Sequence, residues 1–139
     1  MAKSNGEVLL AYNKRIQDIL DSSKNSSLSE SCNLLERSTS QLIAFAQRHP
    51  DRLEYLARDF AFGLARNLAG ALLLEHASWT GAADSDRAAA ERWLGQRDLL
   101  AQSLNLSQNG QNASQSAQKL DDALVFDGYD KKNILSPLF

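Results

Sequence analysis

The sequence predicts an all-α protein whose ordered part is a four-helix up-down bundle. Apolar residues recur three and four residues apart in four separate stretches, as on one face of a helix. Polar or glycine-containing segments separate these stretches, as expected for turns. The third stretch contains residues 60–74, FAFGLARNLAGALLL, which are apolar on most helical faces. This run is shorter than the roughly 18–20 residues of a membrane span, so we expect a buried central helix and no membrane segment.

The first two helices are predicted at residues 4–21 and 27–49. Ser4 or Asn5 can cap the first helix, and its inner face is expected to carry Leu9, Tyr12, Ile16 and Ile19. For the second helix, Ser27 followed by Glu30 forms a capping-box pattern. The second helix should end at His49, because a residue before proline avoids α geometry.

The third helix is predicted from Pro50 to Ala77, because proline suits an early helical position. Gly63, Asn67 and Gly70 fall on one face of it, and the two glycines predict that a neighbouring backbone approaches closely. A buried Asn67 needs a hydrogen-bond partner, which we expect to be a neighbouring backbone group; a ligand is the alternative.

Arg66 interrupts the apolar run of the third helix. Two interpretations remain open for it. It pairs with Asp59 or extends its stem to solvent, or it contacts an anionic partner. His76, near the end of the same helix, is expected to face the last carbonyl groups, because no second metal ligand lies four residues away on either side.

A turn at residues 80–83 precedes a fourth helix, which Asp84 or Ser85 is expected to cap and which should end near Gln102. Trp93 is predicted to be a core residue. Residues 1–102 therefore form the bundle, and the uncharged, Ser/Gln/Asn-rich residues 103–118 read as a flexible linker. Residues 119–139 regain apolar side chains and predict a partly ordered tail that docks on its own fold or on a partner.

Charge and cysteine content narrow the function. The net charge is −2, and both signs are spread along the chain, which argues against nucleic-acid binding. Cys32, the single cysteine, excludes an internal disulfide and a multi-cysteine metal site, and is predicted to be a small core residue. The opening MAKSNGEVLL lacks the apolar region of a signal peptide, so we expect a soluble, intracellular protein, in the cytoplasm or an organelle matrix.

Two segments carry a family resemblance. LARDFAFGLARNLAGALLLEHAS (residues 56–78) and AAAERWLGQRDLL (residues 88–100) resemble the C-terminal helical domain of acyl-CoA dehydrogenases of the adaptive-response AidB type. The opening MAKSNGEVLL also looks like the segment that follows the flavin-domain motif of that family. The resemblance covers about residues 1–100, and residues 103–139 have no such counterpart.

The resemblance implies a domain of an FAD-dependent flavoprotein. In that family the flavin site, the acyl-CoA pocket and the catalytic carboxylate come mainly from the preceding part of the protein. No catalytic, cofactor-binding or metal-binding residue is therefore assigned here, and FAD belongs to the full-length family and not to this chain. Adaptive-response members have been linked to DNA through basic side chains in this domain, but the charge balance here does not support that transfer.

Three functions are weighed. The first is a non-catalytic domain that packs on a larger flavoprotein partner or forms a homo-oligomer. The second is a stand-alone adaptor that uses its apolar tail. The third is nucleic-acid binding through Arg48, Arg52, Arg58, Arg66, Arg87, Arg92 and Arg97. An enzyme acting alone ranks last, because no phosphate loop or Cys/His/Asp array is present. The candidate partner-binding residues are Arg66, Asn67, Gly63, Gly70, Leu124, Phe126 and Phe139.

Overall fold

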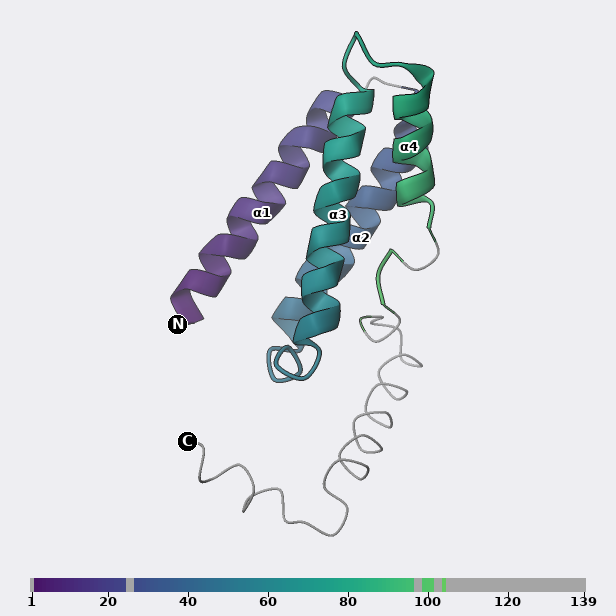
Figure 1. Cartoon of the computed structure of the whole chain (residues 1–139). Coiled ribbons are helices and arrows are strands. Elements are labelled where there is room, and N and C mark those ends of the chain that lie inside the picture. The colour runs from purple at the N-terminus through teal and green to yellow at the C-terminus, as the bar shows by residue number, and fades with distance from the viewer. Residues whose placement is uncertain (1, 25–26, 97–98, 102–103, 105–139) are drawn as a thin grey trace, which may run out of the picture. The chain divides into compact units, whose positions relative to one another are not determined.

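The computed structural model describes residues 2–24, 27–96, 99–101 and 104, with side chains from Gly6 onward. Four helices follow one another: α1 (Ala2–Ser23), α2 (Ser29–Arg48), α3 (Ala57–Ala77) and α4 (Asp84–Leu94). Successive helices run in opposite directions, so the described part is an up-down bundle without strands (Figure 1). The predicted all-α class is confirmed. Within this part, no helix has an apolar stretch long enough to cross a bilayer.

The central pair of helices is α2 and α3. Each of them contacts the other three helices, whereas α1 and α4 flank the pair without contacting each other in the described part of the chain. Figure 1 shows α3 between α1 and α4, with α2 behind it. The core is built from aliphatic side chains of all four helices, including Ile16, Ile19, Leu35, Leu42, Phe45, Leu74 and Leu94. The prediction that residues 60–74 lie in a central helix is confirmed.

The predicted start of the third helix is wrong. Residues 50–56 form consecutive turns, in which Arg52 N–H donates to the His49 carbonyl (3.1 Å) and Leu56 N–H donates to the Arg52 carbonyl (2.9 Å). Leu56 is 6% exposed and Arg52 8% exposed. This segment therefore buries side chains beneath the bundle, and the helix α3 begins only at Ala57.

The predicted end of the fourth helix is also wrong, because α4 stops at Leu94 and not near Gln102. Gly95 N–H donates to the Glu91 carbonyl (2.9 Å), and glycine is a poor helix former. Leu99 and Leu104 beyond it are buried. The packed unit extends to Leu104.

Three predicted helix starts need correction. Helix α1 begins at Ala2, ahead of the expected Ser4 or Asn5 cap. The residue that caps α2 is Leu28, without a side-chain bond, so the Ser27–Glu30 box does not form. For α4 the cap is Ala83, whose backbone N–H donates to the Asp86 carboxylate (2.9 Å). Helices α1 and α4 thus begin earlier than the side-chain pattern indicates, and α2 begins later.

Leucine side chains fill the space at the two glycines of α3. A Cβ atom on Gly63 would lie 2.8 Å from Leu42 Cδ2, and one on Gly70 would lie 2.5 Å from Leu94 Cδ2. Both distances are shorter than van der Waals contact. Neighbouring atoms do approach these glycines closely, as predicted. They belong to leucine side chains of α2 and α4, however, and not to a neighbouring backbone.

Gly70→Ala should lower the free energy of unfolding by about 1–2 kcal/mol, because overpacking Leu94 outweighs the gain in helix propensity. Gly6 in α1 is the matched control, since nothing lies within 4 Å of a Cβ placed there. Gly6→Ala should raise the free energy of unfolding by roughly 0.5–1 kcal/mol. Urea unfolding measures both. Stabilisation by Gly70→Ala would contradict the packing described here.

A tyrosine ties α1 to α3. The Tyr12 hydroxyl donates to the Leu64 carbonyl of α3 (2.9 Å), and burial raises the pKa of the Tyr12 phenol. The neighbouring ion pair between Arg15 and Glu75 (2.8 Å) joins the same two helices, but both side chains are nearly half exposed, so it contributes little.

Tyr12→Phe should lower the free energy of unfolding at pH 7 by about 1 kcal/mol, through loss of one hydrogen bond. A phenol whose pKa is raised on folding stabilises the protein below its unfolded pKa of about 10 and loses that contribution as pH rises further. The wild-type chain should therefore lose more stability than Tyr12→Phe between about pH 9 and pH 11. Denaturant titrations across this range test it, and parallel curves for the two proteins would argue against a buried phenol.

Candidate partner-binding surface

Asn67 lies inside the bundle with 0% exposure. Its Oδ1 accepts from the Ser38 hydroxyl (2.9 Å), and its Nδ2 donates to Thr39 Oγ1 (3.3 Å), both on α2. The single Ser38 proton also lies within reach of the Leu35 carbonyl (3.1 Å). The partners of Asn67 are therefore side chains and not the backbone group expected from the sequence. Because Gly63 and Gly70 are buried as well, these three candidates pack the interior.

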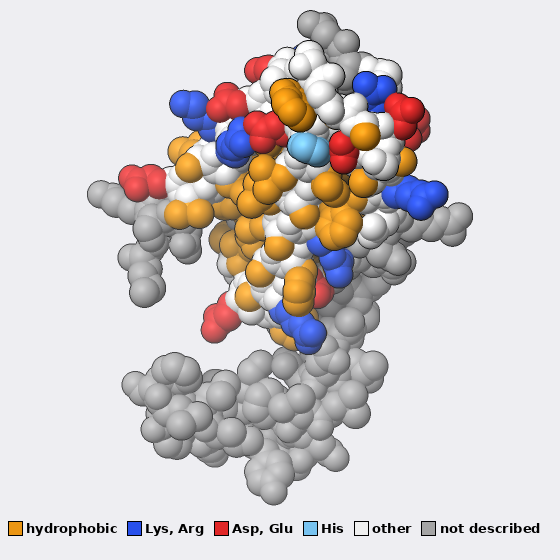
Figure 2. Space-filling view, turned by 45° about the horizontal axis from the view of Figure 1, so that its top comes forward, with side chains coloured by type: hydrophobic (Ala, Val, Ile, Leu, Met, Phe, Trp, Pro, Cys, Tyr) orange, Lys and Arg blue, Asp and Glu red, His pale blue; other side chains and the backbone are white. Residues whose placement is uncertain are grey.

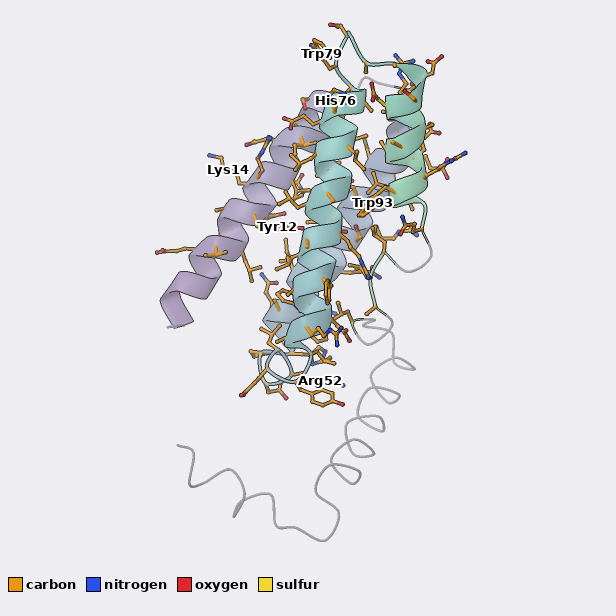
Figure 3. All side chains as sticks on the ribbon, viewed as in Figure 1. Tyr12, Lys14, Arg52, His76, Trp79 and Trp93 are labelled. Carbon is orange, nitrogen blue, oxygen red and sulfur yellow. The ribbon has the colours of Figure 1, made fainter. Side chains whose placement is uncertain are left out.

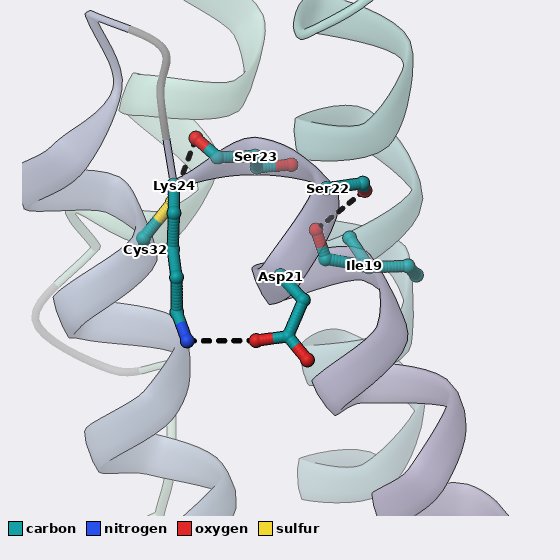
Figure 4. A network of polar contacts seen from close by, with 6 residues as sticks. All are labelled: Ile19, Asp21, Ser22, Ser23, Lys24 and Cys32. Carbon is teal, nitrogen blue, oxygen red and sulfur yellow. Dashed lines mark hydrogen bonds and ion pairs between the residues drawn. The ribbon is translucent and has the colours of Figure 1, made fainter.

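Cys32 also belongs to the interior. Its thiol is 7% exposed and lies 3.8 Å from the Ser23 carbonyl, and burial raises the pKa of the Cys32 thiol. Figure 4 shows this contact beside the exposed pair of Lys24 and Asp21, whose atoms are 2.7 Å apart. The hydrogen bond to Asp21 raises the pKa of Lys24. A thiol held in its neutral form is a core residue, as predicted, and a poor nucleophile.

The side of α3 that faces away from the bundle is apolar. Phe62 is 48% exposed and Leu72 47% exposed, and Ala65, Ala69 and Leu73 lie on the same side of the helix, with Leu73 at its edge also packed against the core. We call these five residues the α3 stripe. Hydrophobic side chains run over the middle of the face shown in Figure 2. Because the outer side of a bundle helix is normally polar, the stripe resembles a face that another surface covers.

Two arginines border the stripe at the Phe62 ring. The guanidinium carbon of Arg58 lies 5.6 Å from the ring centroid and that of Arg66 lies 5.8 Å away, within cation–π range. Arg66 is exposed, so its predicted route to solvent is observed, with the Phe62 ring as an additional contact.

Trp93 joins α4 to α3. Its Nε1 donates to the Arg66 backbone carbonyl (2.8 Å), and Figure 3 shows Trp93 between α3 and α4. Trp93 is half-buried, so the core position predicted for it is only partly realised.

Exposed apolar side chains also occur outside α3, where Val8 is 65% and Leu10 70% exposed on α1. A groove of about 340 Å³ between α1 and α2 is lined by Gly6, Leu9, Leu10, Asn13, Ile43 and Gln47. Trp79, 62% exposed, follows α3 and lies beside the ring of His76, with centroids 6.2 Å apart. His76 Nε2 is 3.5 Å from Asp86 Oδ2, so the side chain of this histidine faces a carboxylate of α4.

The charged residues of the described part do not form a metal site, and not all of the arginines lie free on its surface. No group of three or more His, Cys, Asp or Glu residues there is placed to hold a metal ion. Among the arginines considered for nucleic acid, Arg52 is buried and Arg87 pairs with Asp84 (3.4 Å). Arg97 lies outside the described residues, as do the predicted tail contacts Leu124, Phe126 and Phe139.

Comparison with known proteins identifies the family. The sequence pattern of the family described as "Acyl-CoA dehydrogenase 11 C-terminal domain-like" matches residues 7–126. The chain belongs to this family. The acyl-CoA dehydrogenase resemblance seen in the sequence is thus confirmed, although the AidB subtype is not distinguished. The family pattern also extends to residue 126, well past the point near residue 100 where that resemblance ended.

A relative shows the size of the proteins that carry such a domain. Acyl-CoA dehydrogenase family member 11 of Caenorhabditis elegans is 32% identical over 103 residues, which is 67% of this chain and 17% of the relative. The chain thus spans about one sixth of that protein. No solved structure matches the chain.

Asn67→Ala should lower the free energy of unfolding by about 2 kcal/mol, because it removes two hydrogen bonds and leaves a cavity between α2 and α3. Ser40→Ala is the control, since Ser40 is exposed on the same helix as Ser38 and Thr39. It should change stability by less than about 0.5 kcal/mol. Urea unfolding measures both, and equal effects would show that the buried amide contributes no more than a surface hydroxyl.

Proposed function

We propose that this chain is a non-catalytic helical domain that packs on the dehydrogenase part of an acyl-CoA dehydrogenase-like flavoprotein. The observation that carries the proposal is the α3 stripe, an apolar outer face on the most enclosed helix of the bundle. The match to one sixth of a much longer dehydrogenase supports it, because that relative has a large additional part to supply the covering surface.

The size of the stripe fits a docking role. Phe62 and Leu73 are eleven residues apart, which corresponds to about 16 Å along a helix. Each fully buried Phe or Leu side chain contributes roughly 1.5–3 kcal/mol, and half-exposed ones gain about half of that on docking. A stable protein interface buries on the order of 800 Å² on each partner. The stripe therefore serves as the centre of an interface whose border comes from neighbouring residues of α1 and α4.

In this proposal the chemistry stays with the flavoprotein. Among the described titratable residues, Arg15 pairs with Glu75 and Lys24 pairs with Asp21 on the surface, and Asp86 supports the start of α4. The buried polar groups Asn67, Ser38 and Thr39 satisfy one another. The domain contributes an apolar face and a rigid scaffold, and FAD and the acyl-CoA substrate bind to the other part.

Mixing the full chain with the separately expressed dehydrogenase part of a family member from the same organism should give a 1:1 complex in sedimentation velocity. Amide hydrogens of α3 should exchange more slowly in the complex than in the free chain, since docking suppresses local opening. The free chain is the control for exchange. If the two proteins still sediment independently at about 1 mM, where even a complex with a millimolar dissociation constant is substantially populated, the proposal fails.

A further inference from the structure

We infer that residues 117–126 (AQKLDDALVF) form a short amphipathic helix that docks into the apolar groove between α1 and α2. The segment lies outside the described residues. Three observations support its docking: the shape of the groove, the extent of the family pattern, and the place where the described chain ends. The inference goes beyond the proposed function, because it concerns other helices than the α3 stripe and requires no second protein.

The groove is a concave apolar surface that offers room for side chains from a further helix. Leu9 and Leu10 of α1 and Ile43 of α2 line it, its volume is about 340 Å³, and Leu10 is 70% exposed. Figure 1 shows α1 leaning away from the other helices toward its N-terminus, so the groove lies where the described bundle is most open. Such a groove between two helices accepts the apolar face of an amphipathic helix.

The sequence of the segment predicts such a face. Ala117, Leu120 and Leu124 step by three and four residues, as on one side of a helix. Lys119 and Asp122 fall on the opposite side of the same predicted helix. A helix of about ten residues is marginal in water by itself, so it requires a surface that covers its apolar side.

The family pattern includes this segment in the domain. It matches residues 7–126, a range that contains Leu9 and Leu10 of the groove as well as the whole segment. It stops at Phe126, and the turn signal Asp127-Gly128 follows at the next residue. A stretch that the family shares as part of one domain is expected to pack on that domain. Residues 127–139 are outside the pattern and carry no such expectation.

The described chain ends beside the helix that forms one wall of the groove. A Cβ atom on Gly63 would lie 2.8 Å from Leu42 Cδ2 and 3.5 Å from Leu104 Cδ1, so Leu104 is buried near Leu42 of α2. Ile43, the next residue of α2, lines the groove. Residues 105–116 connect Leu104 to the segment and span up to about 40 Å when extended.

The segment has an advantage over every separate occupant of the groove. A short flexible connection gives it an effective concentration on the order of millimolar, so a few apolar anchors are enough to hold it. The groove also suits it better than the α3 stripe does. Side chains of one helix pack into a groove between others, whereas the stripe is the outward side of a single helix.

Hydrogen exchange of the full-length chain tests the docking. Amide hydrogens of residues 6–13 of α1 should exchange about threefold to tenfold faster in the double variant Leu120→Ser/Leu124→Ser than in the wild type, because docking suppresses local opening. The matched control is Leu135→Ser/Leu138→Ser, which makes the same changes beyond the family pattern and should exchange like the wild type. Circular dichroism checks that each variant folds.

Disulfide formation in the full-length chain tests the position of the segment. The variant Leu10→Cys/Leu124→Cys should close an intramolecular disulfide about tenfold faster than Val8→Cys/Leu124→Cys, since the bond requires Cα atoms roughly 4.4–6.8 Å apart. Val8 is exposed on the same helix but does not line the groove. Cys32 is present in both variants and is buried, and mass spectrometry identifies which cysteines are joined.

The outcomes separate this inference from the proposed function. Equal α1 exchange in the wild type and in Leu120→Ser/Leu124→Ser overturns the inference, as do equal disulfide rates for the Leu10 and Val8 pairs. Disulfides between two copies of the chain assign the groove to the segment of a second copy and overturn it as well. Faster exchange of α3 amides alone places the segment on the stripe, against both proposals. Failure to bind the dehydrogenase part removes only the proposed function.

Discussion

The hydrogen bonds of Asn67 to Ser38 and Thr39 are the constraint on which the rest of the structure depends. They are the point where the two central helices, α2 and α3, recognise each other by polar groups inside an otherwise apolar core. A slide of α3 by one turn would leave a buried amide without partners, at a cost of several kcal/mol. An apolar seam alone tolerates such slides, as coiled coils show. Asn67 therefore sets the register, and it also sets which side of α3 points outward, since Phe62 and Ala69 lie on the side of the helix turned away from it.

Leucine packing at the two glycines completes this arrangement. Leu42 of α2 reaches into the space at Gly63, and Leu94 of α4 reaches into the space at Gly70. Together with the Tyr12 bond from α1, these contacts enclose α3 on three sides. Burial against three helices explains why most of α3 is apolar. It does not explain Phe62, Leu72 and the alanines of the fourth side, so their apolar character requires a separate cause.

The sequence predicted the class, the order of the helices and the central position of α3, because apolar periodicity reports burial directly. It failed at residues 50–56 and after Leu94, where the same periodicity continues but the chain folds back to bury Leu56, Leu99 and Leu104. Tertiary packing decides where such helices begin and end, and a local sequence pattern carries no information about that packing. For the candidate surface, the prediction named Arg66 but did not use the four-residue spacing that brings Arg58 and Arg66 to the Phe62 ring. The outward side of α3 was not predictable, because a helix that is apolar all round gives no direction until its neighbours are placed.

The α3 stripe has few large apolar side chains, and this limits how tightly it can bind a partner. One phenylalanine, two leucines and two alanines bury too little area for a tight complex between freely diffusing proteins. When two domains share one polypeptide, the effective concentration of one for the other is on the order of millimolar, so a weak interface stays closed. The matched region of the C. elegans relative lies in one polypeptide with the remaining five sixths of that protein, which is the situation where such a face suffices. A separate chain with the same stripe needs an additional source of affinity or orientation. The dissociation constant of the isolated chain thus discriminates between the two arrangements: near-millimolar binding fits a domain that works when tethered, and micromolar binding fits one that works alone.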